Sequence, residues 1–339
     1  MTALRKISPA LAILLIALAV LPILAQLADQ SYLITQSRRI LIFALAAVSL
    51  NLVLGYGGMV CFGQAMFFGL GAYTVAFINV AAQGQQTGIW HLLSEPVLSW
   101  ACACLAAALL SFVVGLVSLR TTGVYFIMIT LAFAQMIYFI FVGLKSAGGD
   151  EGLRFTANRS LAGALNLGSS VTFYYVVFAI LALAIWFTAR LMNARFGIVL
   201  QGARDNERRM KALGFETFQY RLAGLVISGA MAGLAGGLFA THEAFISPSI
   251  MHWSRSGELI VMVVLGGMGT LGGPVVGAIV FLMVEKFLPD FTDHWGVWFG
   301  PVLVLSVLFA RNGLMGWLTS RRTPGTTLQA PLRERSSDA

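Results

Sequence analysis

Few residues of this sequence could support catalysis, and their surroundings argue against it. Gly267, Gly269 and Gly272 satisfy the GxGxxG pattern of dinucleotide-binding turns, but they lie in a long apolar run without the strand–turn–helix context of that motif. His242 and Glu243 begin an HExxH pattern whose second histidine is absent, and no P-loop occurs. We therefore expect a protein that is not an enzyme and needs no cofactor or metal. Any use of ATP would fall to partner subunits.

The elements that carry these residues are expected to be membrane helices. Hydrophobic residues make up 58% of the chain and charged residues 11%, whereas soluble domains are about 25% charged. The charges form islands between apolar runs of about 20 residues, the length that spans a bilayer as a helix. The sequence thus predicts an all-α, polytopic integral membrane protein. Its membrane segments, about ten in number, are 7 to 28, 39 to 56, 59 to 80, 97 to 119, 121 to 143, 171 to 190, 221 to 241, 258 to 267, 274 to 288 and 297 to 311.

The distribution of Lys and Arg predicts the orientation of the chain. With these segments, 15 of the 22 Lys and Arg residues lie on the side of the two termini, which the positive-inside rule places in the cytoplasm. The net charge of +8 thus encodes orientation, and we expect no nucleic-acid partner. The first segment is longer than a secretory signal core and is expected to be retained. We expect one transmembrane domain over residues 1 to 320 and a disordered cytoplasmic tail over 321 to 339.

Two of the predicted segments are interrupted by glycines in matching places. GYGGMVCFGQ begins at Gly55 and GGMGTLGGP at Gly266, each at the end of a Val-Leu-Gly tripeptide. Broken helices at membrane depth are typical of substrate paths, although glycines also allow helices to pack closely, and both interpretations stay open. The residues assigned to the translocation path on this basis are Gly57, Gly58, Gln64, Gly267 and Gly269. A further small-residue face, SGAMAGLAGG from Ser228, is expected to pack within the subunit or against a second one.

The charged loop 195 to 221 is expected to carry a short cytoplasmic helix. Asp205 or Asn206 can cap this helix and Gly214 can end it. Its charges would either form a docking surface or anchor the membrane border. The outer loop is the most charged segment on the opposite side, and it contains Lys145, Asp150, Glu151, Arg154 and Arg159.

Five segments resemble one known family. They are GYGGMVCFGQAMFFGLGAYTVAF from Gly55, GGDEGL from Gly148, RDNERRMKALGF from Arg204, SGAMAGLAGGL from Ser228 and VLGGMGTLGGPVVGA from Val264. In order and spacing they resemble the branched-chain amino acid permeases of bacterial ABC importers, over roughly residues 40 to 309. The resemblance implies the ABC importer permease fold and a place in the bacterial inner membrane.

The resemblance also implies a set of partners and roles. The partners would be a second, related permease subunit, two cytoplasmic ATPases and a periplasmic binding protein that delivers leucine, isoleucine, valine or a similar compound. Residues of the charged loop that match the family would couple ATP hydrolysis to transport; they are Arg204, Asp205, Glu207, Ala212 and Gly214. The charged outer loop would meet the binding protein, with a merely solvated loop as the alternative.

Two departures from the family leave the solute open. Cys61 stands where relatives commonly have Ser, and Gly272 where a larger residue often precedes Gly-Pro. Relatives also carry urea, amides and aromatic acids. An ion-coupled secondary carrier is the alternative of another class, although Asp, Glu and Lys are missing from the centres of the predicted segments, which disfavours proton coupling.

Overall fold

A computed structural model describes residues 9–27, 31–83, 89–145, 148–156, 160–161, 165–166, 168–291 and 315. Its helices are α1 (Pro9–Leu27), α2 (Ser31–Asn51), η2 (Leu52–Tyr56), α3 (Gln64–Gln83), α4 (Ile89–Leu93), α5 (Pro96–Ser118), α6 (Val124–Gly143), η4 (Gly149–Glu151), α7 (Ser170–Met192), α8 (Arg195–Asp205), α9 (Glu207–Ala212), α10 (Thr217–Glu243), η5 (Pro248–Met251), α11 (Trp253–Gly266) and α12 (Gly273–Phe291). The strands are β1 (Leu153–Arg154), β2 (Ser160–Leu161), β3 (Leu165–Asn166) and β4 (Phe245–Ile246). β1 pairs with β4 and β2 with β3, both antiparallel.

Six of the described helices are long and apolar enough to cross a membrane. They are Tyr32–Tyr56, Gln64–Gln83, Pro96–Ser118, Val124–Gly143, Ser170–Met192 and Thr217–Glu243. Each overlaps one of the predicted segments, which confirms a helical protein that crosses the membrane several times. Other predicted segments fall on α1, with its shorter apolar stretch Leu11–Pro22, and on α11 and α12. The segment 297 to 311 and the tail 321 to 339 lie outside the described residues.

The small residues of α10 pack within the subunit. A Cβ at Gly233 would lie 2.8 Å from the carbonyl oxygen of Ala103 in α5, and one at Gly236 would overlap the carbonyl oxygen of Phe68 in α3. Close approach of these backbones needs glycine, because any side chain would hold the helices apart. Trp100 Nε1 of α5 also donates to Thr241 Oγ1 of α10 at 3.0 Å. The structure thus assigns this face to the core of the bundle around α10.

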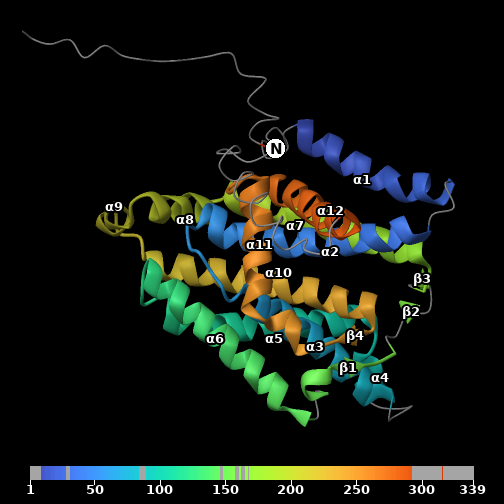
Figure 1. Ribbon diagram of the computed structural model, residues 1–339. Helices are drawn as coiled ribbons and strands as arrows, with labels where there is room; N and C mark the ends of the chain where they lie inside the picture. The colour runs from blue at the N-terminus through green and yellow to red at the C-terminus, as the bar shows by residue number, and fades with distance from the viewer. Residues whose placement is uncertain are drawn as a thin grey trace, which may run out of the picture.

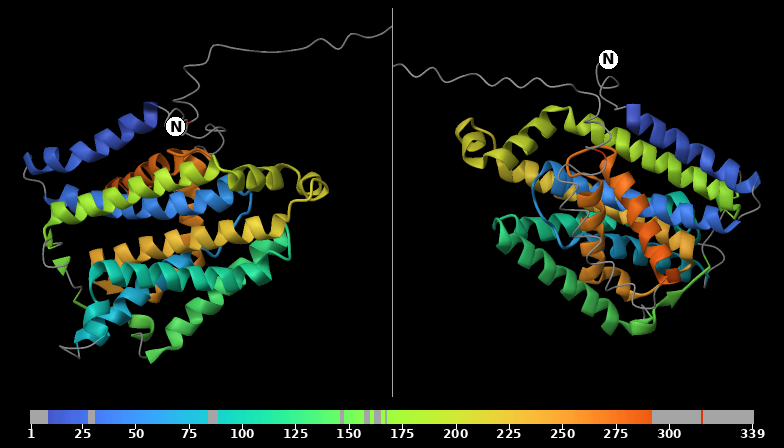
Figure 2. Two further views of the ribbon diagram at one scale, coloured as in Figure 1. Left: turned by 180° about the vertical axis from the view of Figure 1, so that it is seen from behind. Right: turned by 45° about the horizontal axis from the view of Figure 1, so that its top comes forward.

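The two ends of the bundle differ in character. The helices α2, α7 and α10 run side by side, with the charged α8 and α9 at one end and the short strands and α4 at the other (Figure 1). Helix α11 crosses the direction of α2 instead of following it, in Figure 1 and in the tilted view of Figure 2. Helix α1 lies beside α7, where the Tyr174 hydroxyl donates to the carbonyl oxygen of Leu18 at 2.6 Å.

Candidate functional site

The first irregular segment follows α2 directly. Residues Leu52–Tyr56 form a π-helix, a rare conformation that occurs often at functional sites. The Gly57 amide donates to the Leu52 carbonyl at 3.2 Å and the Met59 amide to the Val53 carbonyl at 3.0 Å. Beyond them the chain has no regular structure until α3 begins at Gln64. Gly58 has a φ of +66°, which favours glycine there.

The second irregular segment separates α11 from α12. Gly267 and Gly269 have φ angles of +118° and +74°, so both occupy backbone conformations that suit glycine. Thr270 organises the turn, because its Oγ1 donates to the Gly267 carbonyl at 2.8 Å and accepts from the Gly273 amide at 3.1 Å. The turn therefore leads directly into the first residue of α12.

Asn51, the last residue of α2, joins the two irregular segments. Its Nδ2 donates to the Thr270 carbonyl at 2.9 Å, and its Oδ1 accepts from the Gly269 amide at 2.9 Å. Asn51 is buried, and these bonds satisfy one backbone donor and one backbone acceptor of the half-buried turn. A Cβ at Gly55 would overlap both the Asn51 side chain and the Gly269 amide. One amide side chain thus fixes the two segments against each other.

Arg204, at the end of α8, brings the charged loop to the same place. Its Nη1 donates to the Gly55 carbonyl. A Cβ added at Gly58 would lie only 2.6 Å from the Arg204 Cγ, so the arginine side chain packs directly on this glycine. A cation is favourable here because the last carbonyls of a helix lack partners and carry partial negative charge. We call the set Asn51, Gly55, Arg204, Gly269 and Thr270 the helix-break junction.

The charged loop folds into two short helices. Asn206 caps α9, because its Oδ1 accepts from the Arg209 amide at 2.9 Å, while Asp205 ends α8 and is exposed. Gly214 follows α9 with a φ of +87°, in agreement with its predicted place at the end of the helix. Ala212, the last residue of α9, is exposed.

Glu207 is the centre of an ion cluster that holds α9 against α10. Its Oε1 lies 2.8 Å from Lys211 Nζ and its Oε2 2.8 Å from Arg221 Nη1. Thr217 Oγ1 donates to Oε1 at 3.3 Å, and Arg221 Nη2 also donates to the Ala203 carbonyl of α8 at 3.0 Å. The hydrogen bond from Lys211, with the charge of Arg221, lowers the pKa of Glu207 below its ordinary value. The cluster therefore ties α8, α9 and α10 together.

Exposed apolar side chains surround the tip of this loop. Leu213 is 65% exposed, Phe215 40% and Phe218 38%. Exposed aromatic and aliphatic groups beside charged ones are typical of a surface that a protein partner covers.

Gln64 lies in the interior between α2, α3 and α10. It is fully buried, and its Nε2 donates to Ser49 Oγ at 2.9 Å and to Ser228 Oγ at 3.1 Å. Ser228 Oγ donates in turn to the Ser49 carbonyl at 2.6 Å. The Gln64 Oε1 has no hydrogen-bond partner among the described residues. We call Ser49, Gln64 and Ser228 the buried polar layer.

The other residues predicted for the path meet at the junction or next to it. Gly57 and Gly267 are buried in the two irregular segments, Gly58 lies against Arg204, and Gly269 bonds to Asn51. Asn51 itself was missed from the sequence, although a lone polar residue that ends a long apolar run just before Leu-Val-Leu-Gly is a detectable signal.

The outer loop lies at the opposite end from α9. Lys145, Asp150, Glu151 and Arg154 are exposed, and the Arg154 guanidinium lies 5.4 Å from the centre of the Phe245 ring. Arg159 lies outside the described residues. Among the described residues, no three His, Cys, Asp or Glu side chains gather where they could hold a metal ion.

Two irregular segments that contact each other within a bundle of membrane-crossing helices are typical of transport proteins. Comparison with known proteins gives the family. The chain belongs to the branched-chain amino acid transport system / permease component family, whose model matches residues 32–310.

Individual relatives agree with this assignment. The chain is 27% identical over 298 residues to the high-affinity branched-chain amino acid transport system permease protein LivM of Escherichia coli, covering 81% of this chain and 68% of the relative. It is 26% identical over 305 residues to the probable branched-chain amino acid transport permease protein LivM of Methanocaldococcus jannaschii, covering 79% and 86%. The chain is also 26% identical over 290 residues to the high-affinity branched-chain amino acid transport system permease protein LivH of Escherichia coli, covering 81% of this chain and 91% of the relative. No solved structure matches the chain.

Proposed function

We propose that this chain is the permease subunit of a bacterial ABC importer for branched-chain or related amino acids. Membership in the permease family supports the general function, and the similarity to the branched-chain amino acid permease proteins LivM and LivH supports the solute class. The observation that carries the mechanism is the contact of Arg204 with the Gly55 carbonyl. Through this contact a loop at the end of the bundle reaches the two irregular segments inside it.

In the proposed mechanism the α8–α9 loop is the coupling element. One of the two ATPase subunits binds the exposed tip of the loop, around Ala212 and Gly214. Its closure with the other ATPase on ATP displaces α9 and α8 together, because the Glu207 cluster links them. Arg204 then transmits the displacement to the helix-break junction. A second, related permease subunit completes the path, and Gly57, Gly58, Gln64, Gly267 and Gly269 lie along it in this subunit.

The membrane topology belongs to the same proposal. Residues 1 to 320 form one transmembrane domain of about ten segments, with both termini in the cytoplasm and the two irregular segments as breaks within membrane helices. The loop 195 to 221 then faces the cytoplasm, and 321 to 339 form a tail. On the outer side the periplasmic binding protein docks on the loop that contains Lys145, Asp150, Glu151, Arg154 and Arg159 and delivers the solute.

The test is the energy source of uptake. Membrane vesicles with this chain and its partner subunits should accumulate radiolabelled L-leucine when ATP and binding protein are supplied, with the proton gradient collapsed by an ionophore. Vesicles with an ATPase subunit inactivated by mutation are the control and should not accumulate it. Uptake that collapses with the proton gradient and survives ATP depletion would establish the alternative, an ion-coupled carrier. ATP-driven uptake of urea, an amide or an aromatic acid, but not of leucine, would retain the importer and change its solute.

A further inference from the structure

A group of charged side chains lies toward the end of the bundle opposite to α9 (Figure 1). Arg39 of α2 lies 3.8 Å from Glu285 of α12, measured between Nη2 and Oε1. On α11, Arg255 Nη1 bonds to Glu258 Oε2 at 2.7 Å, and Glu258 also lies within electrostatic range of Arg39 and Glu285. Glu243, at the end of α10, lies within such range of Arg39 as well. Arg39 is thus a cation shared by three carboxylates that belong to three different helices.

The contact between α2 and α12 at this end is loose. A distance of 3.8 Å is longer than a charge-assisted hydrogen bond of about 2.7–2.9 Å, and the side chains of Arg39 and Glu285 are 33% and 25% exposed. Nearby, Lys286 Nζ lies 4.0 Å from the centre of the Tyr32 ring, a cation–π contact between the same two helices. Ion pairs that water reaches contribute little to stability, so α2 and α12 can separate here at small cost.

The beginning of α12 is held more firmly. At the helix-break junction Asn51 bonds through its Nδ2 and Oδ1 to Thr270 and Gly269, in the turn that precedes α12, at 2.9 Å each. A Cβ at Gly277 would overlap the carbonyl oxygen of Met262, so the first half of α12 packs backbone to backbone on α11. Helix α12 is therefore fixed at its beginning, whereas its charged contacts with α2 near its end are loose.

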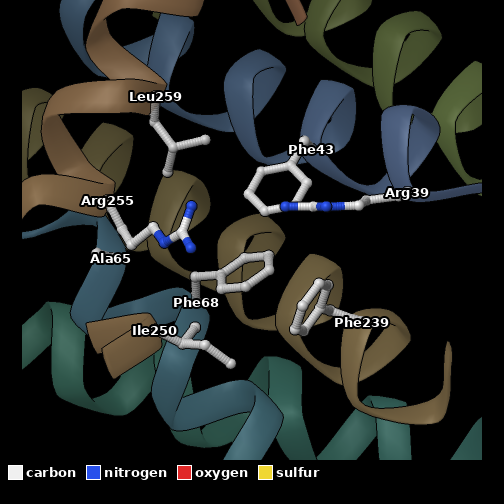
Figure 3. A pocket seen from close by; sticks show the side chains of 8 residues that line it. All are labelled: Arg39, Phe43, Ala65, Phe68, Phe239, Ile250, Arg255 and Leu259. Atoms are coloured by element: carbon white, nitrogen blue, oxygen red, sulfur yellow. The ribbon is translucent and has the colours of Figure 1, made fainter. Parts of the chain in front are cut away.

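A small cavity lies next to this loose contact. It has a volume of about 40 Å³, and Figure 3 shows the side chains of Arg39 and Arg255 extending toward it from opposite sides. Phe43, Phe68 and Phe239 form part of its wall, with ring centres 5.6–5.8 Å apart. A space of this size holds about three waters and is too small for an amino acid. The bundle is therefore closed at this point.

Arg39 connects the cavity with the end of α12. It lines the cavity and also contacts Glu285, so a movement of α12 away from α2 acts on the cavity wall. Ala65 lines the cavity too, and the preceding residue, Gln64, belongs to the buried polar layer. In the proposed orientation a solute from outside would meet the contact between Arg39 and Glu285 first, then the cavity, and then the buried polar layer.

We propose that Arg39 and Glu285 form the outer gate of the translocation path. This inference rests on the proposed function and adds a gate to it. While the pair is in contact, α12 is closed on α2 and the cavity is too small for the solute. When the solute is delivered, the pair separates and the end of α12 moves away from α2, about the fixed beginning of the helix. Charged residues suit this role, because water solvates both of them once the gate is open.

The first test locks the gate. Arg39→Cys and Glu285→Cys are combined in a chain in which Cys61 is replaced by serine and both Cys102 and Cys104 by alanine. A short bifunctional methanethiosulfonate then links the two new thiols in the complete importer complex. Before linkage the complex should take up L-leucine with ATP, since the pair closes the path but does not bind the solute. Linkage should lower uptake at least about tenfold, and reduction of the linker should restore it.

The matched control links two helices outside the gate. Ala19 of α1 and Tyr175 of α7 are in contact, with 3.5 Å between the tyrosine hydroxyl and the alanine carbonyl oxygen. Ala19→Cys with Tyr175→Cys, in the same cysteine-free chain, should be linked by the same reagent and should keep leucine uptake. Loss of uptake only when α2 is linked to α12 would then support a movement of these two helices.

The second test measures entry into the cavity from outside. The reporter is Ala65→Cys, which lines the cavity, and the probe is a membrane-impermeant thiol reagent applied to cells that contain the complete importer. Arg39→Glu places like charges side by side at Glu285 and should raise the reaction rate at least about tenfold, whereas Arg39→Glu with Glu285→Arg restores an attraction and should return the rate toward that of the native pair. Ser49→Cys, in the buried polar layer, should stay unreactive in each case.

Two results would overturn the gate. One is normal leucine uptake by a complex in which nearly all of the thiols of Arg39→Cys and Glu285→Cys are linked. The other is a reaction rate of Ala65→Cys that Arg39→Glu leaves unchanged in a complex that retains its ATPases. ATP-driven leucine uptake by the unaltered complex would still stand in both cases, so failure of the gate and failure of the proposed function are distinguishable.

Discussion

Charge reversal at Glu207 would test how the α8–α9 loop is held against the bundle. In the native loop this carboxylate bonds to Lys211 within α9 and to Arg221 at the start of α10. Glu207→Lys replaces the shared anion by a third cation next to both, so the two attractions become repulsions. We expect α9 to detach from α10 while the membrane bundle stays folded.

The structure sets the size of the effect. The Arg221 side chain is only 16% exposed, so loss of its charge-assisted hydrogen bond costs about 1.5–3 kcal/mol. The Lys211 pair is more exposed, at 62% for the lysine, and adds only about 0.3–0.5 kcal/mol. A six-residue helix such as α9 has almost no stability of its own, so a loss of about 2–3 kcal/mol is enough to unfold it locally.

Co-purification and ATP-driven uptake are the two assays for this variant. We expect Glu207→Lys to insert at normal levels, to retain less ATPase on purification, and to lose at least about tenfold in leucine uptake. Glu216→Lys is the matched control, because it reverses a charge in the same loop at an exposed side chain whose one hydrogen bond among the described residues is to Gln219.

A charge swap sharpens the result. Glu207→Lys combined with Arg221→Glu restores an ion pair of reversed polarity and should recover part of the uptake, as a double-mutant cycle requires of directly interacting residues. Equal loss in Glu207→Lys and Glu216→Lys, with no recovery in the swap, would mean that the net charge of the surface matters and the Glu207 cluster does not.

Three other outcomes follow from the same structure. Asn51→Ala removes the two partly buried hydrogen bonds to the Gly269 amide and the Thr270 carbonyl, so the melting temperature of the purified complex should fall, by an equivalent of about 1–3 kcal/mol, and uptake should drop. Gly236→Ala should prevent close packing of α10 and lower the yield of folded protein, whereas Gly224→Ala, whose Cβ would meet its nearest atoms at 3.6 Å, should be tolerated in the same helix. Because the pKa of Glu207 is lowered in the folded loop, its contribution should be constant above its ordinary value of about 4.5 and be lost as pH falls below that value through the lowered pKa, measured as ATPase retention on a pH series.

Hydropathy was sufficient to predict the helices that can cross a membrane, but it did not predict the course of the shorter helices and of the segments between them. The long apolar runs between charged residues correctly predicted the positions of all six helices that can cross a membrane, of which Tyr32–Tyr56 is the first. The reason is that a helix crossing the lipid needs about 20 mostly apolar residues. Helix α11 has 14 residues and crosses the direction of α2, which no count of apolar residues can foresee. Its course depends on side chains of other helices.

The candidate site also has features that the sequence predicts and features that only the packed structure shows. The cap at Asn206 and the end of α9 at Gly214 were predictable, because both depend on residues within one turn. The junction was not, since Arg204 and Gly55 are separated by 149 positions and Asn51 and Thr270 by 219. The glycine pattern marked both irregular segments, but only the packed structure brings them together.

Helix α2 with its continuation η2 is the element that connects the buried polar layer with the α8–α9 loop. It carries Ser49 in the buried polar layer and Gly55 at the contact with Arg204. At 1.5 Å per residue, Ser49 and Gly55 are about 9 Å apart along a helix that is 94% buried in its apolar window, so a shift at one end moves the other. The π-helical turn lies at the end that Arg204 contacts, and such turns occur often at functional sites. A displacement of the α8–α9 loop would therefore reach the buried polar layer as a movement of this one helix, with no need for a chain of small side-chain changes between the two.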